Sequence, residues 1–206
     1  MSMSDLLCIT NRRLCAGEFL ARLEAIAAAK PAAIVLREKD LPQAAYTDLA
    51  RRVLALCRVH GVRCILHSFP ETAMALGAEA IHLPLPVLRT LTPAQKARFS
   101  VLGASCHSVA DALEAQALGC TYLTAGHIFD TDCKQGLPGR GVAFLQEVCG
   151  SVALPVYAIG GIRPEHMPAI RAAGAAGACV MSGPMRCQDP AAYFQQFSET
   201  EASQWP

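Results

Sequence analysis

The chain has 206 residues, of which 52% are hydrophobic and 17% are charged, and its formal net charge is +1. This length suits one domain with a full core, and the near-neutral charge argues against a nucleic-acid or membrane partner. The N-terminus does not resemble a signal peptide, and no apolar run reaches the roughly 18 residues of a spanning helix. The ten cysteines form no C-x-x-C pair, so we expect a cytoplasmic protein with reduced thiols.

Eight short apolar runs recur along the chain and predict β-strands. Most of them are continuous rather than alternating, which is typical of parallel strands that helices cover. The runs lie at residues 6–10, 32–38, 63–67, 80–84, 101–107, 121–126, 155–160 and 177–183.

Amphipathic stretches between these runs predict helices at 17–30, 46–61, 108–119 and 163–174. The spans near 70–77 and 85–98 contain prolines, so we expect short helices there. Eight βα units in this length predict a single (β/α)8 TIM-barrel domain over residues 1–206. A doubly wound open sheet is the alternative, because α/β alternation alone does not distinguish the two.

In a barrel of this kind, functional residues gather just after the strands. Gly160 and Gly161 follow the seventh run, and Ser182 and Gly183 follow the eighth. Glycine turns let backbone N–H groups approach an anion, a helix start adds a positive dipole end, and these two loops commonly hold phosphate. We predict a phosphate site here; the alternative is that the glycines only make tight turns.

The second run ends in three charged residues, Arg37, Glu38 and Lys39. Arginine can grip a carboxylate or a phosphate with two parallel hydrogen bonds, so we predict that Arg37 or Lys39 contacts the substrate. The alternative is a charge pair that closes the barrel mouth.

Two histidines also follow strands. His127 comes directly after the sixth run, inside a polar glycine-rich loop. Because an imidazole ordinarily titrates near neutral pH, we predict that His127 is a catalytic acid/base. His107 follows the fifth run and precedes a helix, so it either contacts the substrate or holds a neighbouring loop.

The strand ends, taken in order, resemble the thiamine phosphate synthase/TenI superfamily over nearly the whole chain. They read "CIT", "VLREKD", "LGAEAIHLP", "GASCHS", "AGHIFDTDCKQGLPGRG", "AIGGIRPEH" and "CVMSG". The resemblance implies a (β/α)8 barrel. It also implies, for the synthase branch, joining of a thiazole phosphate to a pyrimidine pyrophosphate with Mg²⁺ held by aspartates after strands three and four. Here "LHSFPE" (66–71) and "HLPLPVL" (82–88) stand at those places and contain no aspartate.

The loop "GHIFDTDCKQGLPGRGV" resembles the sixth loop of the TenI-type thiazole tautomerases. This resemblance implies that His127 moves the proton when a carboxythiazole phosphate becomes aromatic. Lys134, in the same loop, would then help to bind the substrate. It implies no metal or other cofactor, and we expect a homodimer. The alternatives are a thiamine phosphate synthase that uses Mg²⁺ through displaced ligands and a non-catalytic regulatory or ligand-binding barrel.

Overall fold

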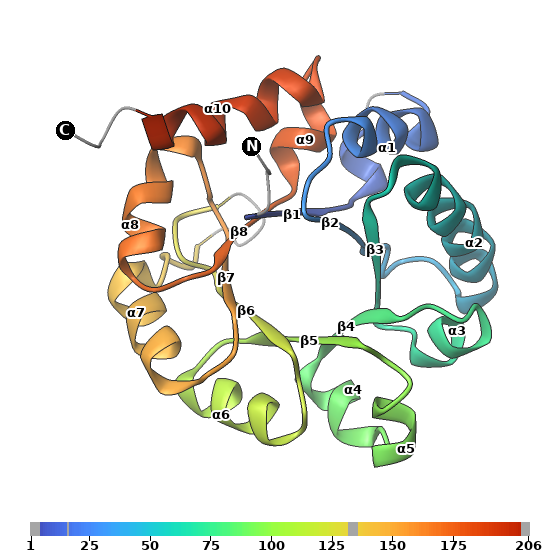
Figure 1. Cartoon of the computed structure of the whole chain (residues 1–206), viewed down its shortest axis with the longest axis horizontal. Coiled ribbons are helices and arrows are strands. Elements are labelled where there is room, and N and C mark those ends of the chain that lie inside the picture. The colour runs from blue at the N-terminus through green and yellow to red at the C-terminus, as the bar shows by residue number, and fades with distance from the viewer. Residues whose placement is uncertain (1–4, 16, 132–135, 203–206) are drawn as a thin grey trace.

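The computed structural model of the chain describes residues 5–15, 17–131 and 136–202. Eight parallel strands pair in chain order and close into a barrel, in which the last strand, β8, pairs with the first, β1. Figure 1 shows the strands as a ring, with the helices outside it. The predicted (β/α)8 barrel is therefore confirmed, and the open sheet is wrong.

Every predicted strand is present, and several end earlier than the apolar run that predicted them. The polar residues that end those runs lie in the loops instead, at the mouth of the barrel. The strands are β1 (Leu6–Ile9), β2 (Ala33–Leu36), β3 (Arg63–His67), β4 (Ala80–Pro84), β5 (Val101–Cys106), β6 (Tyr122–Gly126), β7 (Val156–Ile159) and β8 (Gly177–Val180).

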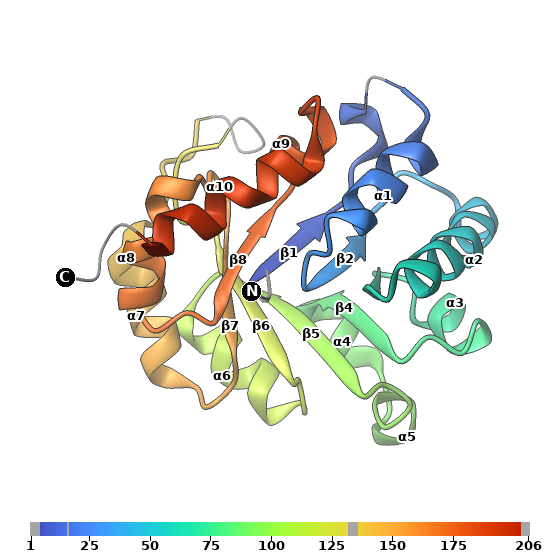
Figure 2. The ribbon, with the colours of Figure 1, turned by 45° about the horizontal axis from the view of Figure 1, so that its top comes forward.

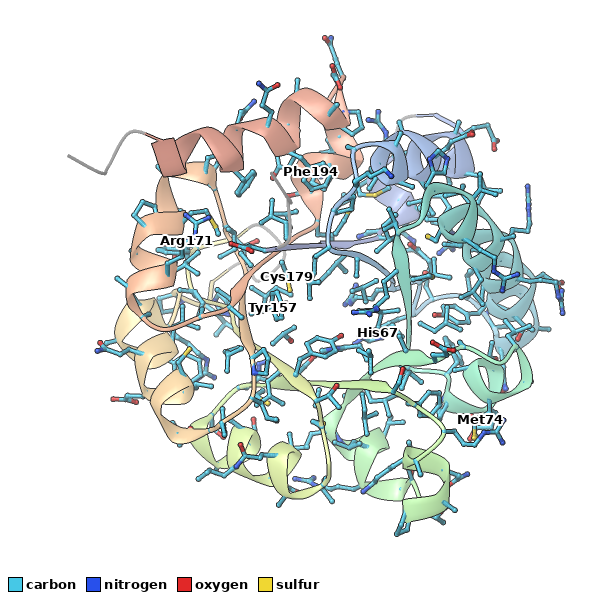
Figure 3. The ribbon with its side chains drawn as sticks, in the orientation of Figure 1. His67, Met74, Tyr157, Arg171, Cys179 and Phe194 are labelled. Atoms are coloured by element: carbon cyan, nitrogen blue, oxygen red, sulfur yellow. The ribbon has the colours of Figure 1, made fainter. Side chains whose placement is uncertain are left out.

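Alternate side chains of the strands face the inside of the barrel, as the two-residue period of a strand requires. Those inside form an apolar cluster of their own, which includes Leu7, Val35 and Cys179. Figure 3 shows Cys179 and Tyr157 pointing into the ring of strands, whereas Phe194 lies outside it, under α10. The outward-facing residues pack against the helices and form the larger core.

The ring of Tyr122 fills much of the barrel interior because its partner across the strand pair is a glycine. Gly103 and Tyr122 are paired in the register of β5 and β6. A Cβ atom on Gly103 would lie 2.2 Å from Cζ of Tyr122, so no other residue fits beside this ring. The Tyr122 hydroxyl can therefore reach the mouth side of the interior.

Helices cover the outside of the barrel, and α10 lies against both α1 and α8 (Figure 2). In the described part of the chain, no helix is long and apolar enough to cross a membrane. The helices are α1 (Phe19–Ala28), α2 (Gln43–His60), α3 (Pro70–Ala75), α4 (Leu85–Thr90), α5 (Pro93–Lys96), α6 (Val109–Ala117), α7 (Gly141–Ser151), α8 (Met167–Ala172), α9 (Ser182–Arg186) and α10 (Pro190–Ala202), with 3-10 turns η1 (Arg12–Leu14) and η3 (Pro164–His166).

The helix predicted at 163–174 is shorter than expected. Its first turn, η3, is a 3-10 turn, and the α-helix α8 begins only at Met167. Pro168 has no N–H to donate, so it belongs in the first turn of a helix rather than in the interior. The short helices expected near 70–77 and 85–98 are confirmed as α3, α4 and α5.

Candidate active site

A cavity of about 530 Å³ opens where the strands end at their carboxyl side. It brings together all the predicted site residues that the structure describes: Arg37, Lys39, His107, His127, Gly160, Gly161, Ser182 and Gly183. Lys134 lies outside the described residues. The polar strand ends, far apart in the sequence, thus meet at one site because parallel strands deliver their carboxyl ends to the same rim.

The residues after β2 alternate in direction. Arg37 and Lys39 line the cavity. Glu38 between them is 2% exposed, and its carboxylate accepts hydrogen bonds from the Thr10 hydroxyl at 2.7 Å and from the Arg12 backbone N–H at 3.0 Å. The Arg12 guanidinium completes this contact at 3.1 Å. Glu38 therefore ties β2 to the segment after β1, and its charged partner is Arg12.

Asp40 also holds the segment after β2 to the segment after β1. Its two oxygens accept from the Arg12 guanidinium at 2.6 and 2.7 Å, and Arg13 lies 2.7 Å away. The hydrogen bond from Arg12 is the main reason that the pKa of Asp40 is lowered to about 2. The anchored carboxylates of Glu38 and Asp40 thus hold the segment from which Arg37 and Lys39 line the cavity.

The imidazole of His127 is held by one of its two nitrogens. Its Nε2 lies 3.1 Å from the carbonyl oxygen of Leu137. A carbonyl only accepts, so Nε2 carries the proton and Nδ1 of the neutral ring carries the lone pair. His127 is 8% exposed, and no described residue gives its Nδ1 a hydrogen bond. The residue is among those that line the cavity.

His107 is held in a similar way by the opposite nitrogen. Its Nδ1 lies 3.0 Å from the carbonyl oxygen of Gly126, so this nitrogen is the donor. The His107 backbone N–H donates to the carboxylate of Asp111 at 2.8 Å. The two interpretations of His107 are thus compatible, because one nitrogen holds the loop after β6 and the ring still lines the cavity.

The predicted phosphate site consists of the turn at Gly160–Gly161 and the first two residues of the short helix α9, Ser182 and Gly183. Gly160 and Gly161 have φ of +97° and +65°, values that favour glycine. A Cβ on Gly183 would lie 2.3 Å from the Tyr193 ring, so this position also needs glycine. However, α9 has five residues and η3 has three, so the expected dipole contribution is small. Backbone N–H groups must provide most of the attraction for an anion.

Sequence reasoning missed a polar network inside the barrel. His82 is buried, and both of its ring nitrogens are hydrogen-bonded. Nδ1 lies 2.9 Å from the Tyr122 hydroxyl, and Nε2 lies 2.8 Å from the Ser105 hydroxyl. The ring of His67 stacks on His82 with centroids 5.4 Å apart, and both line the cavity. Figure 3 shows His67 pointing into the ring of strands.

These two imidazoles are held in the neutral form. Burial, and to a lesser extent the nearby Lys39 ammonium, lower the pKa of His82 to about 3. Burial, His82, Lys39 and Arg37, in that order, hold the pKa of His67 well below its usual range. The strand period offered a signal for both residues, because His67 is two residues after the inward-facing Ile65 and His82 two after Ala80.

The residues of the cavity do not fit a protein-held Mg²⁺. This cation prefers carboxylate and water oxygens, whereas the stretches 66–71 and 82–88, which stand where the synthase resemblance places aspartates, contain none. Among the described lining residues, Asp111 is the one carboxylate, and it already accepts from the His107 backbone. The described residues contain no group of three or more histidine, cysteine or acidic side chains that could hold a metal.

Comparisons with known proteins agree with this architecture. The family model TMP-TENI, thiamine monophosphate synthase, matches residues 6–183. Thiamine-phosphate synthase 2 of Streptococcus pneumoniae is 32% identical over 195 residues, which cover 92% of this chain and 91% of that protein. The thiamine-phosphate synthase of Salinispora arenicola is 37% identical over 158 residues, or 74% of each chain.

Solved structures give the same result. The structure of thiamine phosphate pyrophosphorylase from Pyrococcus furiosus superposes with a TM-score of 0.81 at 25% identity, and the match covers 99% of this chain and 98% of that one. The matched family region runs from the start of β1 to the start of α9 and so includes every strand end at the cavity.

Proposed function

Since the chain belongs to the thiamine monophosphate synthase family, we propose that it is an enzyme of thiamine biosynthesis that isomerises a carboxythiazole phosphate to its aromatic form. The observation that carries this proposal is the His127 imidazole, which lines the cavity and is anchored through Nε2, so that Nδ1 is the nitrogen left for proton transfer. A tautomerisation needs a proton carrier and a grip on the substrate, and it needs neither a leaving group nor a second substrate.

The substrate would lie across the mouth of the barrel. Its phosphate binds the turn at Gly160–Gly161 and the start of α9 at Ser182–Gly183, and its carboxylate binds Arg37 or Lys39. A crystal grown with a thiazole phosphate tests this orientation directly. A phosphate bound away from these two segments would contradict it.

The reaction moves one proton and three electron pairs. The C–H bond at the carboxylate-bearing ring carbon breaks, and its pair forms a ring C=N bond. The former ring C=N pair moves to the neighbouring C–C bond, and the exocyclic π pair takes a proton from the imidazole. Such acid/base catalysis contributes about 10²–10⁴ in rate, and positioning by the phosphate and carboxylate contacts contributes the remainder.

The second candidate is the thiamine phosphate synthase reaction, and the names of the relatives favour it. That reaction expels pyrophosphate, a leaving group whose charge Mg²⁺ ordinarily neutralises. The lining residues argue against it, because Asp111 is the one carboxylate among those that the structure describes. Arg37 and Lys39 would have to replace the cation.

One pair of assays separates the candidates. The purified protein is given the carboxythiazole tautomer with EDTA, and separately a thiazole phosphate and a pyrimidine pyrophosphate with Mg²⁺. We expect aromatic product in the first assay and little coupling in the second. Robust Mg²⁺-dependent coupling without tautomerisation would make the chain a synthase, and tight binding without turnover in either assay would make it a ligand-binding barrel.

A further inference from the structure

Two histidines at the cavity are anchored through opposite nitrogens. His107 donates from Nδ1 to the Gly126 carbonyl at 3.0 Å, and His127 donates from Nε2 to the Leu137 carbonyl at 3.1 Å. Each hydrogen bond fixes which nitrogen of the neutral ring holds the proton. The cavity therefore contains two rings whose second nitrogen, Nε2 of His107 and Nδ1 of His127, can accept or deliver a proton.

We propose that His107 is a second catalytic acid/base, which removes the proton from the ring carbon while His127 delivers a proton to the exocyclic carbon. This inference rests on the tautomerisation proposed above, and it divides between two rings the transfers that one ring would otherwise perform. The ring carbon and the exocyclic carbon are separated by two atoms of the forming thiazole, so two fixed bases can reach them without movement of either ring.

The order of the strands indicates which histidine acts on which carbon. His127 follows β6 and packs beside Gly160, which follows β7 and belongs to the predicted phosphate site. The exocyclic carbon carries the phosphate chain, so a phosphate bound there places this carbon near His127. His107 follows β5, one strand further from the phosphate, where the carboxylate-bearing ring carbon would lie.

His107 can exchange protons with water because it is exposed to solvent. His107 is an exposed residue, whereas His127 is 8% exposed. A proton taken by His107 can therefore leave to solvent even while the substrate covers the cavity. The protons balance: His127 enters the cycle with a proton on Nδ1 and loses it, His107 gains one on Nε2, and water restores both before the next turnover.

Hydrogen exchange at the substrate tests this division. The variant His127→Gln keeps an N–H group near the position of Nε2 but cannot deliver a proton to the exocyclic carbon. In D₂O it should form aromatic product at least about 10²-fold more slowly than wild type. It should nevertheless replace the ring C–H hydrogen of unreacted substrate with deuterium, which NMR detects, because His107 still removes and returns that proton.

The matched variant is His107→Asn, whose amide keeps a donor near the position of Nδ1 but has no base at Nε2. We expect it to lose both the ring-carbon exchange and most of the turnover. His60→Asn, on α2 outside the cavity, should behave as wild type and controls for spontaneous exchange. Circular dichroism of each variant, with retained product binding, shows that the barrel is folded.

The outcomes separate this inference from the proposed function. Wild-type protein that forms no aromatic product would overturn both. Wild-type turnover together with no exchange by His127→Gln would overturn the role of His107 alone, as would near-normal exchange by His107→Asn. Exchange that persists in His127→Gln and disappears in His107→Asn supports the two-base arrangement.

Discussion

A Cβ atom placed on Gly160 would lie 2.3 Å from the Cβ of His127. The glycine that would help to bind the phosphate is thus the same glycine that leaves room for the proposed acid/base. The two parts of the site cannot be altered independently at this position. Replacement of Gly160 should therefore affect proton transfer, even though glycine has no side chain that could take part in it.

We predict that Gly160→Ala lowers turnover at least about 10-fold, because the added methyl group must displace the imidazole. The positive φ of +97° adds backbone strain of about 1–2 kcal/mol. Gly119→Ala is the matched control, since Gly119 has φ of +90° and no atom within 4 Å of its ideal Cβ. Both variants carry the backbone strain, and only Gly160→Ala adds the clash, so Gly160→Ala should lose more of the free energy of unfolding, and steady-state kinetics of the folded proteins should show an activity loss for Gly160→Ala alone.

For His127 itself, glutamine is a sharper replacement than asparagine, because the anchored nitrogen is Nε2. We predict that kcat falls at least about 10²-fold in His127→Gln, while the Kd for the aromatic product changes by less than about 3-fold. Calorimetric titration and single-turnover kinetics provide these two numbers. A variant within a few-fold of wild type in kcat would show that another group carries the proton.

Much of the fold was predictable from the sequence, and the site only in part. The eight apolar runs predicted the number of strands, and the helix predicted to end at residue 61 agrees with α2, which Gly61 caps with φ of +65°. The contact between His107 and the Gly126 carbonyl was not predictable, because it depends on the register of β5 against β6. Local sequence carries no register between two parallel strands.

The contact between His67 and His82 inside the barrel could not be predicted for a related reason. Strands that are covered on both faces read as continuous apolar runs, so the alternation that assigns a residue to one face is weak. His67 and His82 were therefore easy to regard as isolated residues. Only the closed barrel shows that their rings stack on each other.

The buried His82 predicts how stability depends on pH. Its pKa falls from 6.5 to about 3 on folding, so between these values the unfolded chain binds a proton that the folded chain does not. The free energy of unfolding therefore rises with pH in this window, by up to about 1.4 kcal/mol per pH unit for one proton. His67 acts in the same direction, because burial also lowers its pKa.

Urea unfolding at pH values from 4.5 to 7.5 measures this slope. We expect His82→Asn to have a shallower slope than wild type, because one of the two titrating imidazoles is removed. Carboxylates titrate equally in both proteins and cancel in the comparison. Parallel pH curves for the two proteins would mean that His82 is not held neutral in the folded state.

Glu38 should matter to stability and only indirectly to binding. We predict that Glu38→Gln lowers the free energy of unfolding by about 1–3 kcal/mol, because a buried carboxylate that accepts from Thr10 and Arg12 is lost. Asp40→Asn, at a more exposed position of the same network, should cost less. Thermal unfolding of both variants gives the comparison, and an equal or larger loss for Asp40→Asn would contradict it.

The alternation after β2 has a consequence for how this protein could change over evolutionary time. Odd-numbered positions, Arg37 and Lys39, face the cavity, while even-numbered positions, Glu38 and Asp40, hold the chain together. A lineage could therefore exchange the cavity-facing pair and adopt a differently charged metabolite without loosening the scaffold. In a laboratory library, randomising residues 37 and 39 with 38 and 40 held fixed should yield mostly folded variants with altered ligand preference.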